Sequence, residues 1–495
     1  MFIGDILVAH GLVTNADVIA ALELQRDQGG RVGDILVTMG KLELADLEAV
    51  IHAAPPSPRS IAETGSSLPA LLNLLMKGMY AGGLETPSMM GDLLKLPPAA
   101  IRQLLVEAQE RKLLSVLGSA GVQAVSELRY TLSDQGRQWA RDALQQSHYI
   151  GPAPVPLSVY CERIARQRIT NERIDRAAID TAFADLVISA NFVQEIGPAI
   201  NSGRAILLYG PAGNGKTSVA EKIGRIFTDV VYIPYCFEVD GQIIKVFDPG
   251  IHTPVQIKSE TAGRVASVRR EDFDLRWVPC RRPFIVVGGE LTLEMLDLSF
   301  NAHAKFYEAP LHIKALGGIF VIDDFGRQLV RPEELLNRWI VPLESRVDYL
   351  KLHTGKSFSL PFDELVIFST NMLPRDLMDP AFLRRIPYKT AILAPTREEY
   401  RRIFQAISKG AGFEAVDQVV DFVIAELCER NDFPLASFQP KFIIDQVRAA
   451  CKFQGIPPQY RPDLITMALS NLYTKDTVGY GVVSGSSNRR ELAAA

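Results

Sequence analysis

The sequence of 495 residues has few cysteines, little excess of either charge sign and no long uncharged apolar run. Its five cysteines are scattered without Cys-x-x-Cys pairs or histidines at metal-ligand spacing, which argues against a zinc site or a disulfide framework. A formal net charge of −4 gives no global electrostatic reason to expect nucleic-acid binding. The apolar start of the chain carries Asp5 and no basic region, so we expect neither a signal peptide nor a membrane span. These absences predict a cytoplasmic protein.

A glycine-rich loop lies between an apolar run and an amphipathic segment. Residues 205–209 predict a strand and residues 219–223 a helix, which is the context that the spacing G-x-x-x-x-G-K-[ST] needs to bind phosphate. The backbone N–H groups of such a loop, together with the helix N-terminus, attract the phosphates. Lys216 then reaches the β- and γ-phosphates and the Thr217 hydroxyl holds Mg²⁺. The predicted nucleotide-binding residues of this loop are Gly210, Pro211, Ala212, Gly213, Asn214, Gly215, Lys216, Thr217 and Ser218.

Two further apolar segments end in polar side chains that suit a nucleotide site. Residues 319–322 predict a buried strand that presents Asp323 and Asp324 at its carboxyl end. Asp323 would bind the magnesium shell, and Asp324 would orient the attacking water. Residues 365–370 predict another strand, which ends in Asn371, an amide that can hydrogen-bond the γ-phosphate or the water.

A short helix near residues 379–386 carries Arg384 and Arg385 beyond the second of these strands. An arginine placed there can reach the nucleotide of a neighbouring subunit and stabilise charge that develops on the transferred phosphoryl group. The two arginines are therefore predicted to act in trans.

Together these motifs resemble the AAA+ ATPases over residues 178–475, and residues 332–346 look most like MoxR-type and chaperone-type members. The resemblance assigns Lys216 and Thr217 to Walker A, Asp323 and Asp324 to Walker B, Asn371 to sensor 1, and Arg384 or Arg385 to the arginine finger. Asp324 departs from the family, because most members carry Glu there and the catalytic carboxylate is here one methylene shorter. The resemblance implies ATP and Mg²⁺ as cofactors.

Other positions in the ATPase region have two interpretations each. Lys441, at the start of a C-terminal helix, is the predicted sensor 2 residue, with Arg461 in reserve, and a solvated helix charge is the alternative. Phe247 is either a central-pore aromatic or a core aromatic. Arginines between residues 269 and 282, interleaved with acids and aromatics, are interpreted as a subunit-contact surface before a nucleic-acid surface.

Residues 1–51 contain an internal repeat of 29 residues. Residues 3–8 return as residues 32–37, and Gly11 and Gly40 keep the same spacing. Each copy predicts a short helix, a glycine turn and a second amphipathic helix, so that two copies can bury their apolar faces against each other. The pattern resembles the amino-terminal domain of type II secretion and type IV pilus assembly ATPases.

That resemblance leaves two roles open for the repeats. In some relatives they bind cyclic di-GMP through an arginine just before the repeated segment, and this chain has Arg31 in the second copy but Phe2 in the first. The interpretation we favour is a protein-docking module, which would direct the chain to a pilus or secretion machine. Cyclic di-GMP is the rival ligand.

The middle of the chain predicts a winged helix, with two strands over residues 113–117 and 127–132 and a closing helix capped by Ser133. Binding of DNA requires neutralisation of phosphates. The third helix mixes Arg and Lys with Glu, and residues 118–126 of the wing tip contain no basic residue. We therefore favour a protein-interaction role over DNA binding.

The fold class expected is α/β: a P-loop core with a parallel sheet and helices on both faces, plus a helical lid, preceded by a helical repeat domain and a winged-helix domain. The predicted divisions are a repeat domain (1–51), a linker (52–67), a winged helix (68–148), a linker and helix (149–177), the AAA+ domain (178–394), the lid (395–475) and a disordered tail (476–495). The predicted activity is ATP hydrolysis coupled to remodelling of a protein partner by a homo-oligomeric ring, expected to be a hexamer. The alternatives are a DNA-directed ATPase or transcription regulator and a cyclic di-GMP-responsive ATPase.

Overall fold

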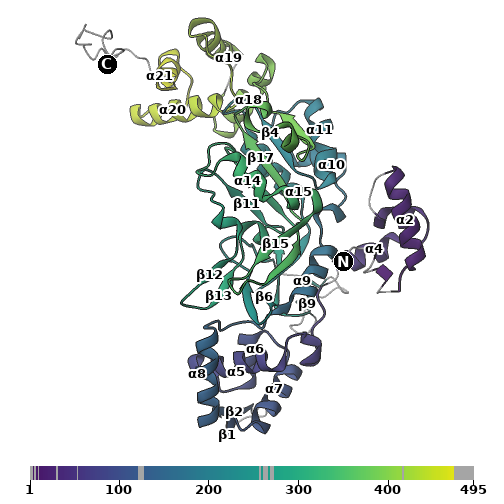
Figure 1. Ribbon diagram of the computed structural model, residues 1–495. Helices are drawn as coiled ribbons and strands as arrows, with labels where there is room; N and C mark the ends of the chain where they lie inside the picture. Colours follow the sequence, from purple (N-terminus) through teal and green to yellow (C-terminus); the bar gives the residue numbers. More distant parts are fainter. Residues whose placement is uncertain are drawn as a thin grey trace, which may run out of the picture. The chain divides into compact units, whose positions relative to one another are not determined.

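The computed structural model describes residues 4, 7–8, 11–28, 32–52, 54–120, 127–255, 258–259, 266–267, 273–414 and 417–472 (Figure 1). The chain divides into two compact units. The first comprises Met1–Ala184, Ile188–Tyr209 and Lys216–Ala391, and the second comprises Asp185–Val187, Gly210–Gly215 and Ile392–Ala495. None of the described helices is long and apolar enough to cross a membrane.

The N-terminal repeat folds as helices that obey the 29-residue spacing. The helices are α2 (Asn15–Gln28), α3 (Val32–Thr38) and α4 (Leu44–His52). Gly11 and Gly40 make the turns with φ of 69° and 67°, a conformation that glycine adopts without steric cost. The two turns have matching backbone hydrogen bonds, from Gly11 to Val8 and from Gly40 to Val37, each 2.9 Å long.

The core of these helices consists of equivalent residues from the two copies. Its buried residues include four pairs that are each 29 positions apart: Leu7 and Leu36, Val13 and Leu42, Val18 and Leu47, and Ala21 and Val50. The sequence repeat is thus also a repeat in packing.

Residues 68–146 form three helices, a two-stranded hairpin and a closing helix. The elements are α5 (Leu68–Gly82), α6 (Pro87–Leu94), α7 (Pro98–Glu110), β1 (Leu114–Ala120), β2 (Glu127–Leu132) and α8 (Asp134–Gln146). Side chains of Ser67, Thr86 and Ser133 accept backbone N–H groups at three helix starts, which satisfies donors that a helix leaves open. The strands pair antiparallel, with Leu114 opposite Leu132.

A five-stranded parallel sheet forms the centre of the first unit. Its order is β11 (Phe284–Val287), β14 (Ile319–Ile322), β17 (Leu365–Thr370), β4 (Ile206–Tyr209) and β18 (Tyr388–Ala391). All four pairings are parallel. The strands β4, β14 and β17 therefore end at the same edge, with β17 between the other two.

Helices cover both faces of this sheet. On one face, Leu207, Phe320 and Phe368 pack with the fully buried Trp339 and its neighbours from α14 (Pro332–Arg338) and α15 (Ile340–Ser345). Strand residues at alternate positions, including Leu208 and Val321, are also buried, and α12 (Lys216–Ile226) and α11 (Ala190–Ser202) contact β17 and β18. The remaining helices near the sheet are α10 (Arg176–Ala182), α16 (Pro374–Leu377) and α17 (Pro380–Leu383).

The first unit also contains a second sheet, which is mixed and which the sequence did not predict. Its order is β12 (Ser299–Asn301), β13 (Phe306–Glu308), β7 (Gln242–Lys245), β6 (Cys236–Val239) and β3 (Val155–Pro156). Two-stranded pairs join β5 (Val230–Pro234) to β10 (Trp277–Arg281), β15 (Val347–Lys351) to β16 (Ser357–Pro361) and β8 (Lys258–Ser259) to β9 (Ala266–Ser267). Short helical segments are η1 (Ala62–Thr64), α9 (Leu157–Arg166), η2 (Ile169–Asn171), η3 (Glu294–Leu296) and α13 (Leu311–Lys314).

Apart from residues 185–187 and the loop 210–215, the described part of the second unit consists of helices and their connections. Its elements are α18 (Arg397–Gly410), α19 (Asp417–Ile424), the π-helix η4 (Ala425–Arg430), α20 (Gln439–Gln454) and α21 (Pro462–Leu472). A capping box between Thr396 and Glu399 starts α18. The predicted α/β class, with a parallel sheet and a helical C-terminal region, is confirmed.

Candidate functional site

The glycine-rich loop connects β4 to α12, and its backbone explains its composition. Gly210, Gly213 and Gly215 have φ of 143°, 77° and 86°, which L side chains rarely adopt. At Gly210 an added Cβ would also lie 2.1 Å from the carbonyl oxygen of Ile392. Glycine is required at this position for both conformation and space.

Side chains at the carboxyl ends of three neighbouring strands meet in one hydrogen-bonded cluster. The Thr217 hydroxyl donates to Asp323 Oδ2 at 2.7 Å, and Lys216 Nζ donates to Asn371 Oδ1 at 2.5 Å. Asn371 Nδ2 donates in turn to Asp324 Oδ1 at 3.1 Å. The cluster therefore contains five residues that the sequence predicts for the site.

The turn after β14 holds the two acids in a defined conformation. Asp324 has φ of 48°, in the left-handed region that Asp tolerates better than most residues. Its carboxylate is exposed, whereas Phe325 next to it is buried. Gln328 secures the turn, because its Nε2 donates to the carbonyl oxygen of Asp323 at 2.9 Å and its Oε1 accepts from the backbone N–H of Gly326. Sequence reasoning did not identify Gln328.

The charges that shift the pKa of Lys216 include one from a residue that the sequence analysis did not assign to the site. Burial lowers the pKa of Lys216, while the carboxylates of Asp323 and Asp324 act to raise it. The positive charge of Arg327, an exposed residue, also lowers that pKa. The position of Arg327 in the sequence, three residues after Asp324, is the feature from which its presence near the site could have been predicted.

The donor set suits Mg²⁺. A hydroxyl and a carboxylate 2.7 Å apart are hard oxygen ligands, and Mg²⁺ usually takes one or two protein oxygens together with phosphates and waters. Among the residues described, no group of three or more His, Cys, Asp or Glu side chains could hold a metal ion. Thr217 and Asp323 are thus suited to share a metal with a bound phosphate.

Within the second unit, the loop contacts the start of α20. The backbone N–H of Phe438 donates to the carbonyl oxygen of Gly213 at 2.9 Å, and that of Ser437 donates to Asn214 Oδ1 at 3.1 Å. Lys441 lies exposed in the first turn of α20. Arg461 forms an ion pair with Asp463 at 2.7 Å. The contacts favour Lys441 over Arg461 as the sensor 2 residue, and the assignment stays a prediction.

The two arginines after α17 have different surroundings. Arg385 donates to Glu344 Oε1 at 2.6 Å and to the carbonyl oxygen of Ala381 at 3.1 Å. Arg384 is exposed, and the described part of the chain offers its guanidinium no hydrogen-bond or ion-pair partner. Arg384 is therefore the arginine that is available to another molecule.

Two interpretations made from sequence change with the structure. Phe247 is half-buried, stacks on His252 with ring centroids 5.6 Å apart and packs on the core around the second sheet, so its core interpretation is supported. Of the arginines interpreted as a contact surface, Arg276 and Arg282 are buried. Arg276 pairs with Asp274 at 2.8 Å and Arg282 with Asp229 at 2.6 Å. Residues 268–272 of that stretch lie outside the described residues.

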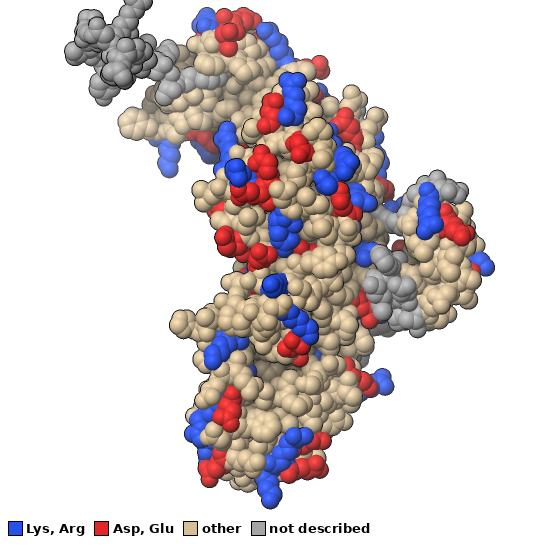
Figure 2. All heavy atoms as spheres, viewed as in Figure 1, with Lys and Arg blue, Asp and Glu red and all other residues tan. Residues whose placement is uncertain are grey.

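Three arginines of the winged region are paired with acids. Arg111 lies 3.7 Å from Glu107 and Arg137 lies 2.6 Å from Asp134, and Arg129 pairs with Glu85. The hairpin exposes Val116, Leu117 and Leu128 instead. On the face shown in Figure 2, blue and red side chains are interspersed, without a broad area of one sign. Arg31, on which the cyclic di-GMP prediction depends, lies outside the described residues.

Comparison with known proteins gives limited similarity. Residues 396–471 match a family described as a domain of unknown function (DUF8689). No curated protein matches the chain. Among solved structures, NtrX from Brucella abortus is similar with 15% identity and a TM-score of 0.36, covering 69% of this chain and 68% of that one. Domain III of the replication initiation protein DnaA from Thermotoga maritima has 13% identity and a TM-score of 0.33, covering 60% of this chain and 98% of that one.

Proposed function

We propose that this chain is an AAA+ ATPase that hydrolyses ATP with Mg²⁺. The observation that carries the proposal is the cluster at the carboxyl edge of the parallel sheet, where Lys216, Thr217, Asp323, Asp324 and Asn371 are linked by hydrogen bonds. Ligands of open α/β sheets bind at this edge, where a glycine loop and helix N-terminus favour phosphate.

Each side chain has a role that follows from its contacts. Lys216 neutralises the β- and γ-phosphates, and on binding exchanges Asn371 Oδ1 for phosphate oxygens. Thr217 and Asp323 provide oxygens for Mg²⁺, which in turn neutralises phosphate charge. Asp324 is exposed and accepts from Asn371, so its free oxygen can hold the attacking water. The shorter carboxylate of Asp324 places this water closer to the turn than Glu would.

Assembly into a ring, with a hexamer as the expected size, forms part of the proposal. Arg384, which is exposed and has no partner among the residues that the structure describes, supports a trans contact, whereas Arg385 is already bound to Glu344. In this scheme Arg384 stabilises charge on a neighbour's transferred phosphoryl group, and Arg385 keeps Glu344 neutralised.

The energy of hydrolysis is proposed to remodel a protein partner. The winged region supports protein contact over DNA contact, because three of its arginines are paired with acids and its hairpin exposes apolar side chains. The N-terminal repeats are proposed to dock the enzyme on its partner machine. Because these repeats resemble the amino-terminal domain of pilus and secretion ATPases, pilus and secretion machines are the first class of partner to test.

The test of the ATPase proposal is Lys216→Ala in the full chain. We expect calorimetric binding of MgATP by the wild type and loss of most of that affinity in the variant, because the ammonium that neutralises the phosphates is removed. Lys351→Ala, which removes an exposed lysine on β15, is the matched control and should bind as the wild type does.

Hydrolysis gives the second readout of the same experiment. Wild-type turnover should require Mg²⁺ and disappear in Lys216→Ala. Equal MgATP affinity in the wild type and Lys216→Ala would contradict the assignment of the loop. If the wild type binds MgATP but releases no phosphate, the proposed hydrolysis is refuted, and the protein binds nucleotide without hydrolysing it.

A further inference from the structure

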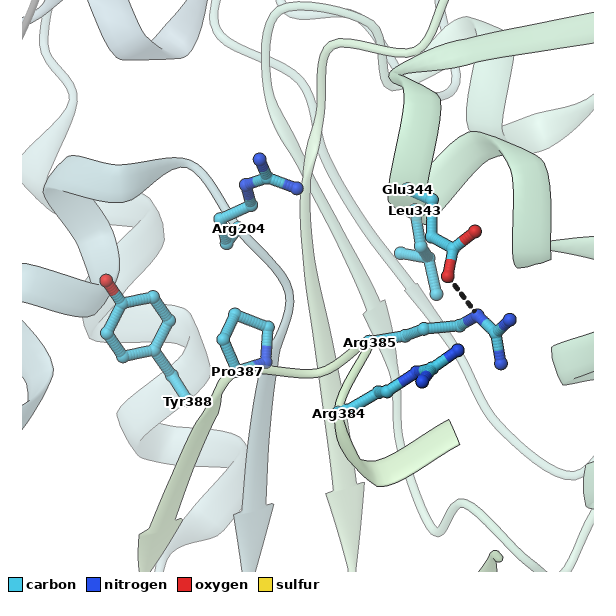
Figure 3. Close-up of a pocket in the computed structure, with 7 residues that line it drawn as sticks. All are labelled: Arg204, Leu343, Glu344, Arg384, Arg385, Pro387 and Tyr388. Carbon is cyan, nitrogen blue, oxygen red and sulfur yellow. Dashed lines mark hydrogen bonds and ion pairs between the residues drawn. The ribbon is translucent and has the colours of Figure 1, made fainter. Parts of the chain in front are cut away.

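A cavity of about 470 Å³ lies at the amino ends of strands of the parallel sheet. The cluster of Lys216, Thr217, Asp323, Asp324 and Asn371 lies at the carboxyl ends. The lining of the cavity is Arg204, Leu343, Glu344, Arg384, Arg385, Pro387 and Tyr388 (Figure 3). Figure 3 shows the side chains of Arg384 and Arg385 extending from one turn in the same direction, with Arg204 apart from them and above Pro387 in this view. Three arginines thus line a small, partly apolar hollow.

The charges of this pocket are not balanced. Glu344 is paired with Arg385 at 2.6 Å. The lining thus contains one acidic residue and three arginines. In the part of the chain that the structure describes, the guanidinium groups of Arg204 and Arg384 have neither a hydrogen-bond nor an ion-pair partner, and both residues are exposed. Arginine stays charged at all ordinary pH values and binds phosphate through a rigid fork of donors. The pocket is therefore complementary to an anion with several oxygens.

The sheet register separates this pocket from the chain's own nucleotide site. Ile206 of β4 pairs with Tyr388 of β18, and both strands begin there. Arg204 and Pro387 precede those first residues, whereas Asp323 and Asn371 follow the last residues of β14 and β17. At a rise of about 3.3 Å per residue, Arg204 lies roughly 17 Å along the strand from Tyr209. An arginine side chain does not span that distance, so the anion is not the chain's own nucleotide.

We propose that the pocket receives the terminal phosphate of a nucleotide held by a second copy of the chain, with Arg204 acting in trans beside Arg384. This inference rests on the proposed function and adds Arg204, a residue that no motif singles out. Arg204 precedes the strand of the glycine loop, so the segment that leads into one subunit's loop also completes the neighbour's site. Arg385 takes no phosphate, because it neutralises Glu344, which would otherwise repel the anion.

The experiment compares Arg204→Ala and Arg204→Lys in the full chain with Arg173→Ala, which removes an exposed arginine outside the pocket. Arg204→Ala should lower turnover roughly 10- to 100-fold, the effect of losing one hydrogen bond between charged groups, and leave MgATP affinity within about twofold. Arg204→Lys should recover part of the loss, since it keeps the charge without the fork. Arg173→Ala should behave as the wild type does.

Mixing gives a readout that a local structural defect would not produce. Arg204→Ala has an intact loop and Lys216→Ala an intact pocket, so mixed assemblies contain interfaces where both are intact. Recovery of turnover above the sum of the separate samples supports the trans site.

Wild-type turnover in Arg204→Ala, with Arg384→Ala impaired, would overturn the role of Arg204 and leave the proposed ATPase standing. Absence of turnover in the wild type would instead refute the proposed function. A third outcome is that Lys216→Ala binds inorganic phosphate or ATP and that the Lys216→Ala, Arg204→Ala double variant does not. The pocket would then be a site for a free anion, which also overturns the proposal.

Discussion

At the scale of single residues, Glu364 stands out as a carboxyl group without a partner. It is fully buried at the start of β17, and among described residues neither of its carboxyl oxygens has a hydrogen-bond partner. Burial raises its pKa well above the ordinary value, although the nearby Arg346 acts in the opposite direction. A buried carboxylate without partners is costly, so Glu364 is protonated in the folded protein over part of the pH range in which it ionises when unfolded.

Glu364→Gln should therefore change how stability depends on pH. A raised pKa in the folded state means that the folded protein binds more protons than the unfolded one above about pH 4, so wild-type stability falls as the pH rises through the folded pKa. The variant lacks this loss, and its free energy of unfolding relative to wild type should increase from acidic to neutral pH. Urea unfolding at a series of pH values measures the difference.

Glu195→Gln, which changes an exposed carboxylate on α11, is the control for that series. It should follow the wild-type curve. Parallel curves for Glu364→Gln and the wild type would mean that the buried carboxyl ionises normally.

At the scale of elements, the glycine loop and α20 act as one structural element. Two backbone N–H groups at the start of α20 donate to Gly213 and Asn214, and the Phe438 ring lies where a Cβ on Gly213 would be, 2.3 Å from Cδ1. A movement of α20 therefore alters the conformation of the loop. In the proposed ATPase, this contact would couple the C-terminal helices to the loop that binds the nucleotide.

Gly213→Ala should weaken MgATP binding through two separable effects. The methyl group clashes with Phe438, and alanine at φ of 77° adds strain of about 1–2 kcal/mol. Phe438→Ala removes the clash but not the strain, so the double variant should recover only part of the affinity, as measured by calorimetry. Full recovery of affinity in the double variant would mean that the strain at φ of 77° is unimportant. No recovery would mean that the Phe438 ring moves aside at little cost, so that the clash is unimportant.

Elements that carry a local motif could be predicted from sequence. The strand before the loop and the strands ending in Asp323 and Asn371 are short apolar runs followed by diagnostic residues, and parallel pairing then brings their ends together. The second sheet was not predicted, because its strands are short. Its local pairs, β6 with β7 and β12 with β13, are joined to each other and to β3 only by the pairings of β13 with β7 and of β6 with β3, which are distant in sequence. Arg204 was missed for a related reason, since only the pairing of β4 with β18 places it near Arg384.

At the scale of the whole molecule, Arg276 joins three segments that are distant in sequence. Its guanidinium donates to Asp274, to the carbonyl oxygen of Thr64 at 2.8 Å and to that of Pro154 at 3.1 Å. Thr64 of the predicted linker and Pro154 after the winged region are thus held against the segment that leads into β10. A surface role was inferred for Arg276 because its partner carbonyls cannot be recognised in a sequence.

Arg276→Ala should lower the free energy of unfolding by about 3–5 kcal/mol, because it leaves Asp274 charged and buried without its partner. It should also free residues 54–66, so that trypsin cleaves faster after the exposed Arg59. Arg281→Ala, which removes the exposed last residue of β10, is the control for both urea unfolding and proteolysis. Equal cleavage rates in the two variants would show that other contacts hold the segment.

The 29-residue repeat has a consequence for how its domain is held together. A core made of equivalent residues from two copies is what a symmetric homodimer of one copy would have, with each partner contributing the same surface. Joining the copies in one chain makes their association intramolecular, so the effective concentration of each for the other is set by a connection of a few residues rather than by dilution. Helices too short to be stable alone can therefore fold at any cellular abundance of the protein.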